Sequence, residues 1–288
     1  MIETTRGNFA VALPNILNDE EKRDMTVLHE NFVLSDLANA IQSDAVEIVD
    51  LTTPLSSATP ALRLPAPFAN LIDFSLEQVS SYDEPGPYWR HNNIHTGEHV
   101  GTHIDAPIHW ISGRDNHDVS QIPLKKLIGA ACVIDLSAEA AKDPDFLLEI
   151  EHVKAWEAEH GALPENSWLL FRTGWDQYAF DEAKFLNTDE NGPHTPGVSV
   201  ECSKWLADET KISGFGVETV GIDAGGAGGM DPAFPMHYFL LGKNKYGLTS
   251  LQNLASLPPA GSMIVVSPLP IVGGTGSPTR VLALVDRS

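Results

Sequence analysis

Cysteine is nearly absent from this sequence of 288 residues, which contains Cys132 and Cys202 alone. The two cysteines form no C-x-x-C pair, which excludes zinc ribbons and thioredoxin-type redox motifs. One disulfide in a secreted protein would also fit this number, but so low a count fits a reducing compartment at least as well. We therefore expect a cytoplasmic protein.

Positive charge is also scarce, because 18 Lys and Arg stand against 39 Asp and Glu, a formal net charge of −21. No basic cluster is visible, which argues against nucleic-acid binding, since phosphate contacts need grouped Lys and Arg. The same balance argues against docking on an anionic membrane surface. No apolar run approaches the roughly 20 residues that a membrane-spanning helix needs, and no secretory signal pattern is seen.

Short β-branched runs alternate with helical patterns along most of the chain. The periodicity predicts strands at residues 46–51, 131–136, 168–173, 219–223, 263–266 and 281–285. It predicts helices at residues 33–41, 150–160, 200–211 and 248–257. Mixed elements in this order indicate one α/β domain over residues 45–288, preceded by an N-terminal extension or arm over residues 1–44.

The most informative feature is a group of histidines, five of which lie between residues 91 and 109. The dense part reads His99-Val-Gly-Thr-His103-Ile-Asp105-Ala-Pro-Ile-His109. Imidazole nitrogen and carboxylate oxygen are ligands for borderline divalent cations. Glycine and proline disfavour a helix here, so we expect an extended segment with His103 and Asp105 on one side of a strand. His99 would reach in from the preceding turn, and three protein ligands would leave positions for water and substrate.

Other candidate residues are weaker. Glu218 and Asp223 flank a predicted strand, and we expect a surface charge and a turn residue rather than a catalytic pair. Trp89 lies ten residues before His99, where an aromatic ring can stack on a flat substrate, with core packing as an equal alternative. The same applies with less support to Trp110 and Trp175.

Residues 99–109 match H-x-G-T-H-x-D-x-P-x-H, and on this motif the chain resembles the metal-dependent hydrolases called the cyclase family. Kynurenine formamidases and isatin hydrolases belong to that family. Further stretches, among them Gly97-Glu98-His99 and Gly274-Thr275-Gly276-Ser277-Pro278, are similar to the isatin hydrolase branch. The resemblance implies an α/β fold of the swivelling β/β/α type, with a mixed sheet or barrel and surrounding helices. It also implies a homo-oligomer, a dimer or higher, that hydrolyses an amide-type C–N bond in a small aromatic substrate.

The resemblance also implies roles for single residues. The family's metal ligands match His99, His103 and Asp105. His109 matches its general acid/base, and His237 matches a second active-site histidine near metal and substrate. Ser250 matches a serine that faces the active site in isatin hydrolases, and Trp89 stays a candidate for substrate binding.

The number of metal ions depends on a neutral residue. In kynurenine formamidases a glutamate in an I-L-E-N-L stretch helps to bind a second zinc, whereas the corresponding stretch here reads Ser250-Leu251-Gln252-Asn253-Leu254. Gln252 is a poorer cation ligand than a carboxylate, and isatin hydrolases also lack that glutamate. The resemblance thus implies one divalent ion per subunit, with manganese favoured and zinc as the alternative.

The favoured activity is hydrolysis of a cyclic aryl lactam, isatin to isatinate being the first choice. One alternative is an arylformamidase acting on N-formylkynurenine, which Gln252 disfavours. The other is a non-catalytic metal-containing protein that binds an aromatic acid. His109 and His237 disfavour it, because a pure binding protein needs no proton-transfer histidine.

Overall fold

The structure is a computed structural model that describes residues 33–64 and 67–287. The chain divides into two units, residues 1–46 and 47–288. In the first unit the helix α2 (Val33–Gln42) confirms the helix expected at residues 33–41. The predicted N-terminal extension before Val33 lies outside the described residues, so its role stays a prediction.

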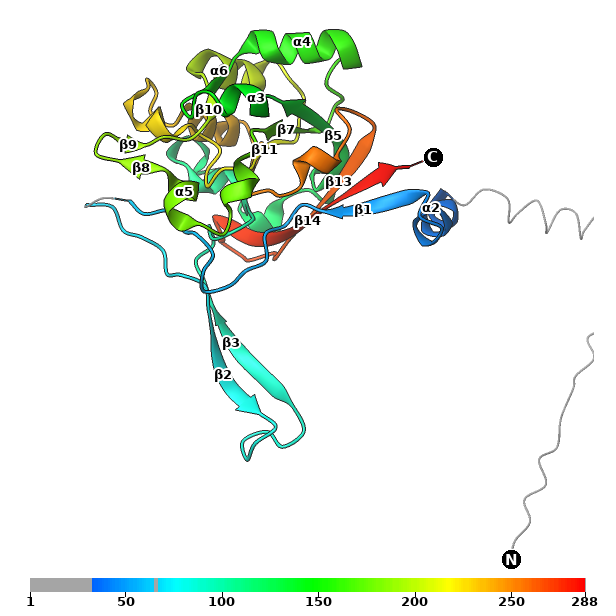
Figure 1. The fold of residues 1–288 in the computed structure, drawn as a ribbon, viewed down its shortest axis with the longest axis vertical. Helices are drawn as coiled ribbons and strands as arrows, with labels where there is room; N and C mark the ends of the chain where they lie inside the picture. Colours follow the sequence, from blue (N-terminus) through cyan, green and yellow to red (C-terminus); the bar gives the residue numbers. More distant parts are fainter. Residues whose placement is uncertain (1–32, 65–66, 288) are drawn as a thin grey trace, which may run out of the picture. The chain divides into compact units, whose positions relative to one another are not determined.

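A barrel of seven strands forms the centre of the second unit (Figure 1). Around the barrel the strands follow the order β14 (Gly276–Asp286), β13 (Ser262–Pro268), β5 (Ile128–Asp135), β7 (Trp168–Arg172), β11 (Gly214–Val217), β12 (Tyr246–Thr249) and β4 (His103–Asp105). β4 also pairs with β14, which closes the barrel, and β1 (Val46–Asp50) extends the sheet beside β14. β5, β7, β11 and β12 are parallel, whereas β4, β13 and β14 pair in antiparallel fashion. The predicted mixed α/β fold is confirmed.

Two apolar clusters on opposite faces of the barrel strands stabilise this arrangement. Inward-facing side chains such as Ile104, Leu170 and Val281 fill the barrel and are fully buried. Leu169 and Phe171 alternate with them on β7 and pack outward, in the cluster that includes residues of α4 (Ile150–His160) and α6 (Val200–Asp208). Because both faces of β7 are buried, its sequence is continuously apolar rather than alternating.

Two of the predicted elements are wrong. Residues 219–223 form no strand, because the strand β11 ends just before them at Val217. Residues 248–257 form no α-helix but contain the end of β12 and the short 3₁₀ helix η8 (Leu254–Ser256). Ser250 and Asn253 have φ values of 53° and 60°, which an α-helix does not admit. Pairing of β12 with both β11 and β4 decides its conformation, so tertiary context overrides the local pattern.

Smaller elements surround the barrel. A hairpin that the periodicity did not predict, β2 (Ser75–Ser81) with β3 (Arg90–His95), projects away from it (Figure 1). Every residue of β3 is exposed. Beside several 3₁₀ helices, the smaller elements include α3 (Ser137–Ala140), α5 (Glu182–Leu186), and the short pairs β6 (Leu147–Leu148) with β10 (Gly197–Val198) and β8 (Thr188–Asp189) with β9 (Gly192–Pro193). Over residues 33–64 and 67–287, no helix has the length and apolar character to cross a membrane.

Candidate metal centre and active site

The strand β4 carries two of the three predicted metal ligands. His103 and Asp105 lie on one side of it, while Ile104 between them faces the barrel core. His99 lies in the turn that precedes the strand, where Gly101 adopts a φ of 64° that favours glycine. The extended segment expected from the sequence is thus confirmed.

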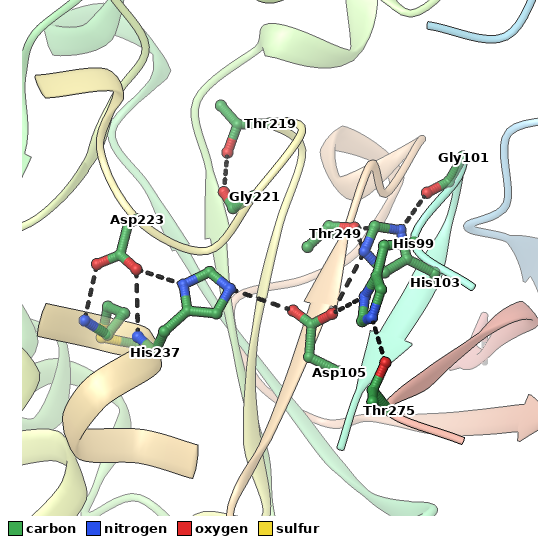
Figure 2. Close-up of polar contacts among 11 residues, drawn as sticks. His99, Gly101, His103, Asp105, Thr219, Gly221, Asp223, His237, Thr249 and Thr275 are labelled. Atoms are coloured by element: carbon green, nitrogen blue, oxygen red, sulfur yellow. Dashed lines mark hydrogen bonds and ion pairs between the residues drawn. The ribbon is translucent and has the colours of Figure 1, made fainter. Parts of the chain in front are cut away.

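The three side chains converge on one point (Figure 2). Asp105 Oδ1 lies 2.7 Å from His99 Nδ1 and 3.3 Å from His103 Nε2, and one donor atom from each residue lies within 4.8 Å of the others. Burial alone would raise the pKa of Asp105, but the hydrogen bonds and charges of His103 and His99 outweigh it and hold that pKa well below its ordinary value. An ionised carboxylate between two imidazoles is a donor set for a divalent cation.

Hydrogen bonds orient the His103 ring. Its Nδ1 donates to the carbonyl of Gly101 at 2.7 Å, which leaves Nε2 as the nitrogen that can bind a metal. Thr249 Oγ1 on β12 lies against the same ring, 2.9 Å from Nδ1 and 3.2 Å from Nε2. A ligand histidine whose other nitrogen is held by the backbone is typical of metal sites in proteins.

His237 is brought to this cluster from a distant part of the chain. It begins the π-helix η7 (His237–Leu241), and its Nε2 lies 3.8 Å from Asp105 Oδ2. Asp223 holds it in place, because Oδ2 of Asp223 accepts hydrogen bonds from both the backbone nitrogen and Nδ1 of His237 (Figure 2). Burial lowers the pKa of His237, but the hydrogen bond and charge of Asp223 raise it more, so that it exceeds its ordinary value.

Asp223 makes more contacts than the sequence predicts for a turn residue. The side chain is almost completely buried, and its Oδ1 also accepts from the backbone nitrogen of Met236 at 2.7 Å. Asp223 lies in a bend of the loop after β11, and its side chain orients His237. No local sequence pattern predicts the contact between Asp223 and His237, because the two residues meet only through the fold of the intervening loop.

The expectation that Glu218 is a surface charge is wrong, because its side chain is fully buried. Its Oε2 accepts hydrogen bonds from the backbone nitrogens of Thr173, Gly174 and Trp175, after β7. Burial and the charge of Asp176 raise the pKa of Glu218 to about 7. Glu218 directly follows the buried strand β11. Because the sequence predicts the strand at residues 219–223 instead, it does not predict that Glu218 is buried.

His109 lies at the end of the 3₁₀ helix η1 (Pro107–His109), directly after β4. Its ring centroid is 4.0 Å from that of His99 and 5.5 Å from that of His237. Its ring nitrogens make no hydrogen bond to any residue that the structure describes, and they are free for water or substrate. Burial lowers the pKa of His109 to about 3, because the neighbouring histidines add to that effect and Asp105 offsets only part of it. The His109 imidazole is therefore neutral near pH 7.

Aromatic rings line one side of the histidine cluster. The Trp110 ring lies 4.8 Å from His237 and 5.5 Å from Phe234. Phe234 was not predicted; its φ of 55° is an outlier for an aromatic residue, and such outliers cluster at functional sites. Rings placed in this way offer a stacking surface for a flat substrate.

The structure places the other candidates differently. Trp89 stands on the hairpin, where it stacks on His91 at a centroid distance of 6.2 Å, outside the histidine cluster. Ser250 follows Thr249 and is buried, and its Oγ makes no hydrogen bond within the described chain. Gln252 donates to the carbonyl of Asp176 at 3.5 Å rather than to the cluster. Trp175 packs in a core cluster with Tyr178.

Comparison with known proteins identifies the family of this chain. The Cyclase family model matches residues 49–224. An isatin hydrolase of Roseibium aggregatum is 47% identical over 258 residues, which are 88% of this chain and 98% of that protein. A crystal structure of an isatin hydrolase bound to the product analogue thioisatinate is 46% identical with a TM-score of 0.86, over 88% of this chain and 98% of that one. A kynurenine formamidase of Salinibacter ruber is 28% identical over 66% of this chain and 77% of its own. The resemblance seen in the motif is confirmed, and the chain belongs to the cyclase family.

Proposed function

We propose that this chain is a metal-dependent amidohydrolase that opens the lactam C–N bond of isatin to give isatinate. The observation that carries the proposal is the convergence of His99, His103 and Asp105, with His109 and His237 beside them. The identity of 47% to an isatin hydrolase supports the choice of substrate. The ring surface of Trp110 and Phe234 supports a flat aromatic one.

The donor set fits one divalent cation, because two imidazoles and one ionised carboxylate converge with one donor atom each within 4.8 Å of the others. Bound there, the cation would lower the pKa of a water ligand and polarise the lactam carbonyl. We favour manganese, with zinc as the alternative, since both accept nitrogen and oxygen donors. One ion per chain is proposed because the neutral Gln252 makes its contact with Asp176.

Proton transfer falls to His109. In this proposal it takes a proton from the attacking water and returns it to the lactam nitrogen as the C–N bond breaks. The hydroxyl adds to the carbonyl carbon, so the product carries both a carboxylate and an amine in one molecule. His237 points its Nε2 at the cluster, where it can donate to the developing oxyanion. Ser250 contacts the substrate in this proposal.

We also propose a homo-oligomer, a dimer being the simplest. The β2–β3 hairpin supports it, because Leu76, Tyr88 and Ile94 are 56%, 86% and 68% exposed and a two-stranded hairpin alone is marginally stable in water. Trp89 can bind substrate in this arrangement if the hairpin reaches the site of a neighbouring copy. A cytoplasmic location remains our proposal, and both cysteines are free and buried, which suits a reducing compartment.

The test is metal analysis of the purified protein combined with an ultraviolet assay on isatin and N-formylkynurenine. We expect about one equivalent of metal per chain, turnover of isatin, loss of turnover with a chelator, and recovery when the metal returns. Faster turnover of N-formylkynurenine with two metal equivalents would replace the proposal by an arylformamidase. Tight isatinate binding without any turnover would replace it by a binding protein.

A further inference from the structure

Two stretches that are 176 residues apart meet behind the metal centre. Thr275, which directly precedes β14, places its Oγ1 2.9 Å from His99 Nε2 (Figure 2). The same Oγ1 lies 2.5 Å from Oε2 of Glu98, and the backbone nitrogen of Thr275 donates to that oxygen as well. A carboxylate, a hydroxyl and an imidazole are therefore connected in a row, and the proposed mechanism does not use the first two.

The donors and acceptors in this row can be assigned. A carboxylate accepts hydrogen bonds, so the single hydroxyl proton of Thr275 is donated to Glu98. The Thr275 oxygen can then only accept from His99, and Nε2 of His99 must carry a proton. Nδ1 of His99 faces Asp105 Oδ1 at 2.7 Å, so it is the nitrogen that gives up its hydrogen bond to Asp105 when a cation binds between them.

We propose that Glu98 and Thr275 are positioning residues that hold the proton of His99 on Nε2 and so select Nδ1 as the metal-binding nitrogen. A partner on the second nitrogen of a ligand histidine fixes its tautomer and its ring orientation and raises its basicity. The inference deepens the proposed function, because it rests on the metal centre at His99, His103 and Asp105.

The two ligand histidines need different hydrogen-bond partners because they bind the metal through different ring nitrogens. His103 donates its Nδ1 proton to the carbonyl of Gly101 in its own turn, and binds through Nε2. His99 has the opposite arrangement. The proton on its Nε2 is held by the side chain of Thr275, which lies 176 residues further along the sequence. Without Thr275, nothing else in the described chain holds the Nε2 proton of His99.

Closure of the barrel brings together this row of hydrogen bonds from Glu98 through Thr275 to His99, called the relay below. Gly276 pairs with Asp105 across β14 and β4, and the carbonyl of Thr275 accepts from the backbone nitrogen of Ala106 at 2.9 Å. A Cβ atom on Gly276 would lie 2.5 Å from Cε1 of His99, so glycine is required for the ring to lie against the strand. The strand pair that closes the barrel therefore sets both the ring and its hydroxyl partner.

The relay can be tested on the full-length protein with zinc, which is diamagnetic. We compare wild type, Thr275→Val, Thr275→Ser and Glu98→Gln by zinc competition against a chromophoric chelator and by ¹⁵N–¹H spectra of the histidine rings. Thr275→Val is nearly isosteric and removes the hydroxyl, so zinc affinity should fall by roughly 10- to 100-fold. Its His99 ring should also lose the Nε2-protonated signature.

Thr275→Ser keeps the hydroxyl and should retain both the affinity and the spectrum of the wild type. Glu98→Gln keeps an acceptor without charge and should give an intermediate affinity; it also serves if Thr275→Val fails to fold. The relay is overturned if Thr275→Val keeps the wild-type zinc affinity and the wild-type His99 spectrum. If only Glu98→Gln folds, the same result in that variant overturns it. Absence of zinc binding in the wild type would instead overturn the metal centre and the proposed function with it.

Discussion

Asp223 holds His237 through two hydrogen bonds, since its Oδ2 accepts from both the backbone nitrogen and Nδ1 of that histidine. One carboxylate thereby fixes the start of the π-helix and the direction of the ring. The consequence is that Nε2 of His237 faces Asp105 at 3.8 Å. Each contact in this chain of residues can be removed separately.

Asp223→Asn should reduce kcat without releasing metal. An amide can replace only one of the two acceptor oxygens, so its NH₂ group opposes either the Nδ1 proton of His237 or the backbone nitrogen of Met236. We expect roughly a 10- to 100-fold loss of kcat on isatin, the usual effect of removing the partner of a site histidine. Metal content is measured alongside, and a parallel loss of metal would show that His237 is a ligand.

Asp105→Ala should lose both bound metal and activity. The carboxylate is the only anionic donor of the cluster, and two imidazoles alone bind a divalent ion more weakly. Asp115→Ala, at a carboxylate that is 89% exposed in a nearby loop, is the matched control and should keep both properties. Full metal occupancy with normal turnover in Asp105→Ala would refute the site.

His109→Ala should separate chemistry from metal binding. The ring of His109 stacks on His99 but does not share the converging donor atoms, so the metal should stay bound. We expect kcat to fall by roughly 10²- to 10⁴-fold, the contribution of a positioned proton-transfer group. His194→Ala, at a surface histidine that pairs with Asp145 and Asp189, should leave kcat unchanged. If metal is lost from His109→Ala together with activity, His109 is a ligand.

Glu218 should make stability depend on pH. Because its folded pKa of about 7 lies above the ordinary 4.5, its contribution to the free energy of unfolding is complete below pH 4.5 and is lost as pH rises through 7. Glu218→Gln does not titrate. From about pH 5 to about pH 8, the stability of the wild type relative to this variant should therefore fall by about 2–3 kcal/mol.

Urea unfolding of both proteins, at the same metal concentration and at several pH values, measures this difference. Contributions from the metal and from other groups cancel, because the two chains differ at a single buried side chain. Parallel stability curves for the two proteins would mean that Glu218 is already ionised in the folded state, held by the backbone nitrogens after β7.

The sequence alone indicated the candidate metal ligands, because the spacing of His99, His103 and Asp105 is local. The turn and the strand of three residues that follows it bring these side chains close together in the chain, and the barrel then fixes the orientation of the His99 ring. The sequence also determined the α/β class and the strands β5, β7 and β13, whose apolar runs are continuous enough to be seen without a structure.

Only the tertiary structure decided what surrounds those ligands. Asp223 meets His237, and Thr275 meets His99, through loop folding and barrel closure, which link residues far apart in sequence. The local pattern predicts a helix over residues 248–257 that begins inside β12, because the conformation of β12 comes from pairing on both edges and not from its own propensity. Burial of Glu218 likewise depends on which strand it follows, since a carboxylate in sequence carries no sign of the backbone nitrogens that the fold will bring to it.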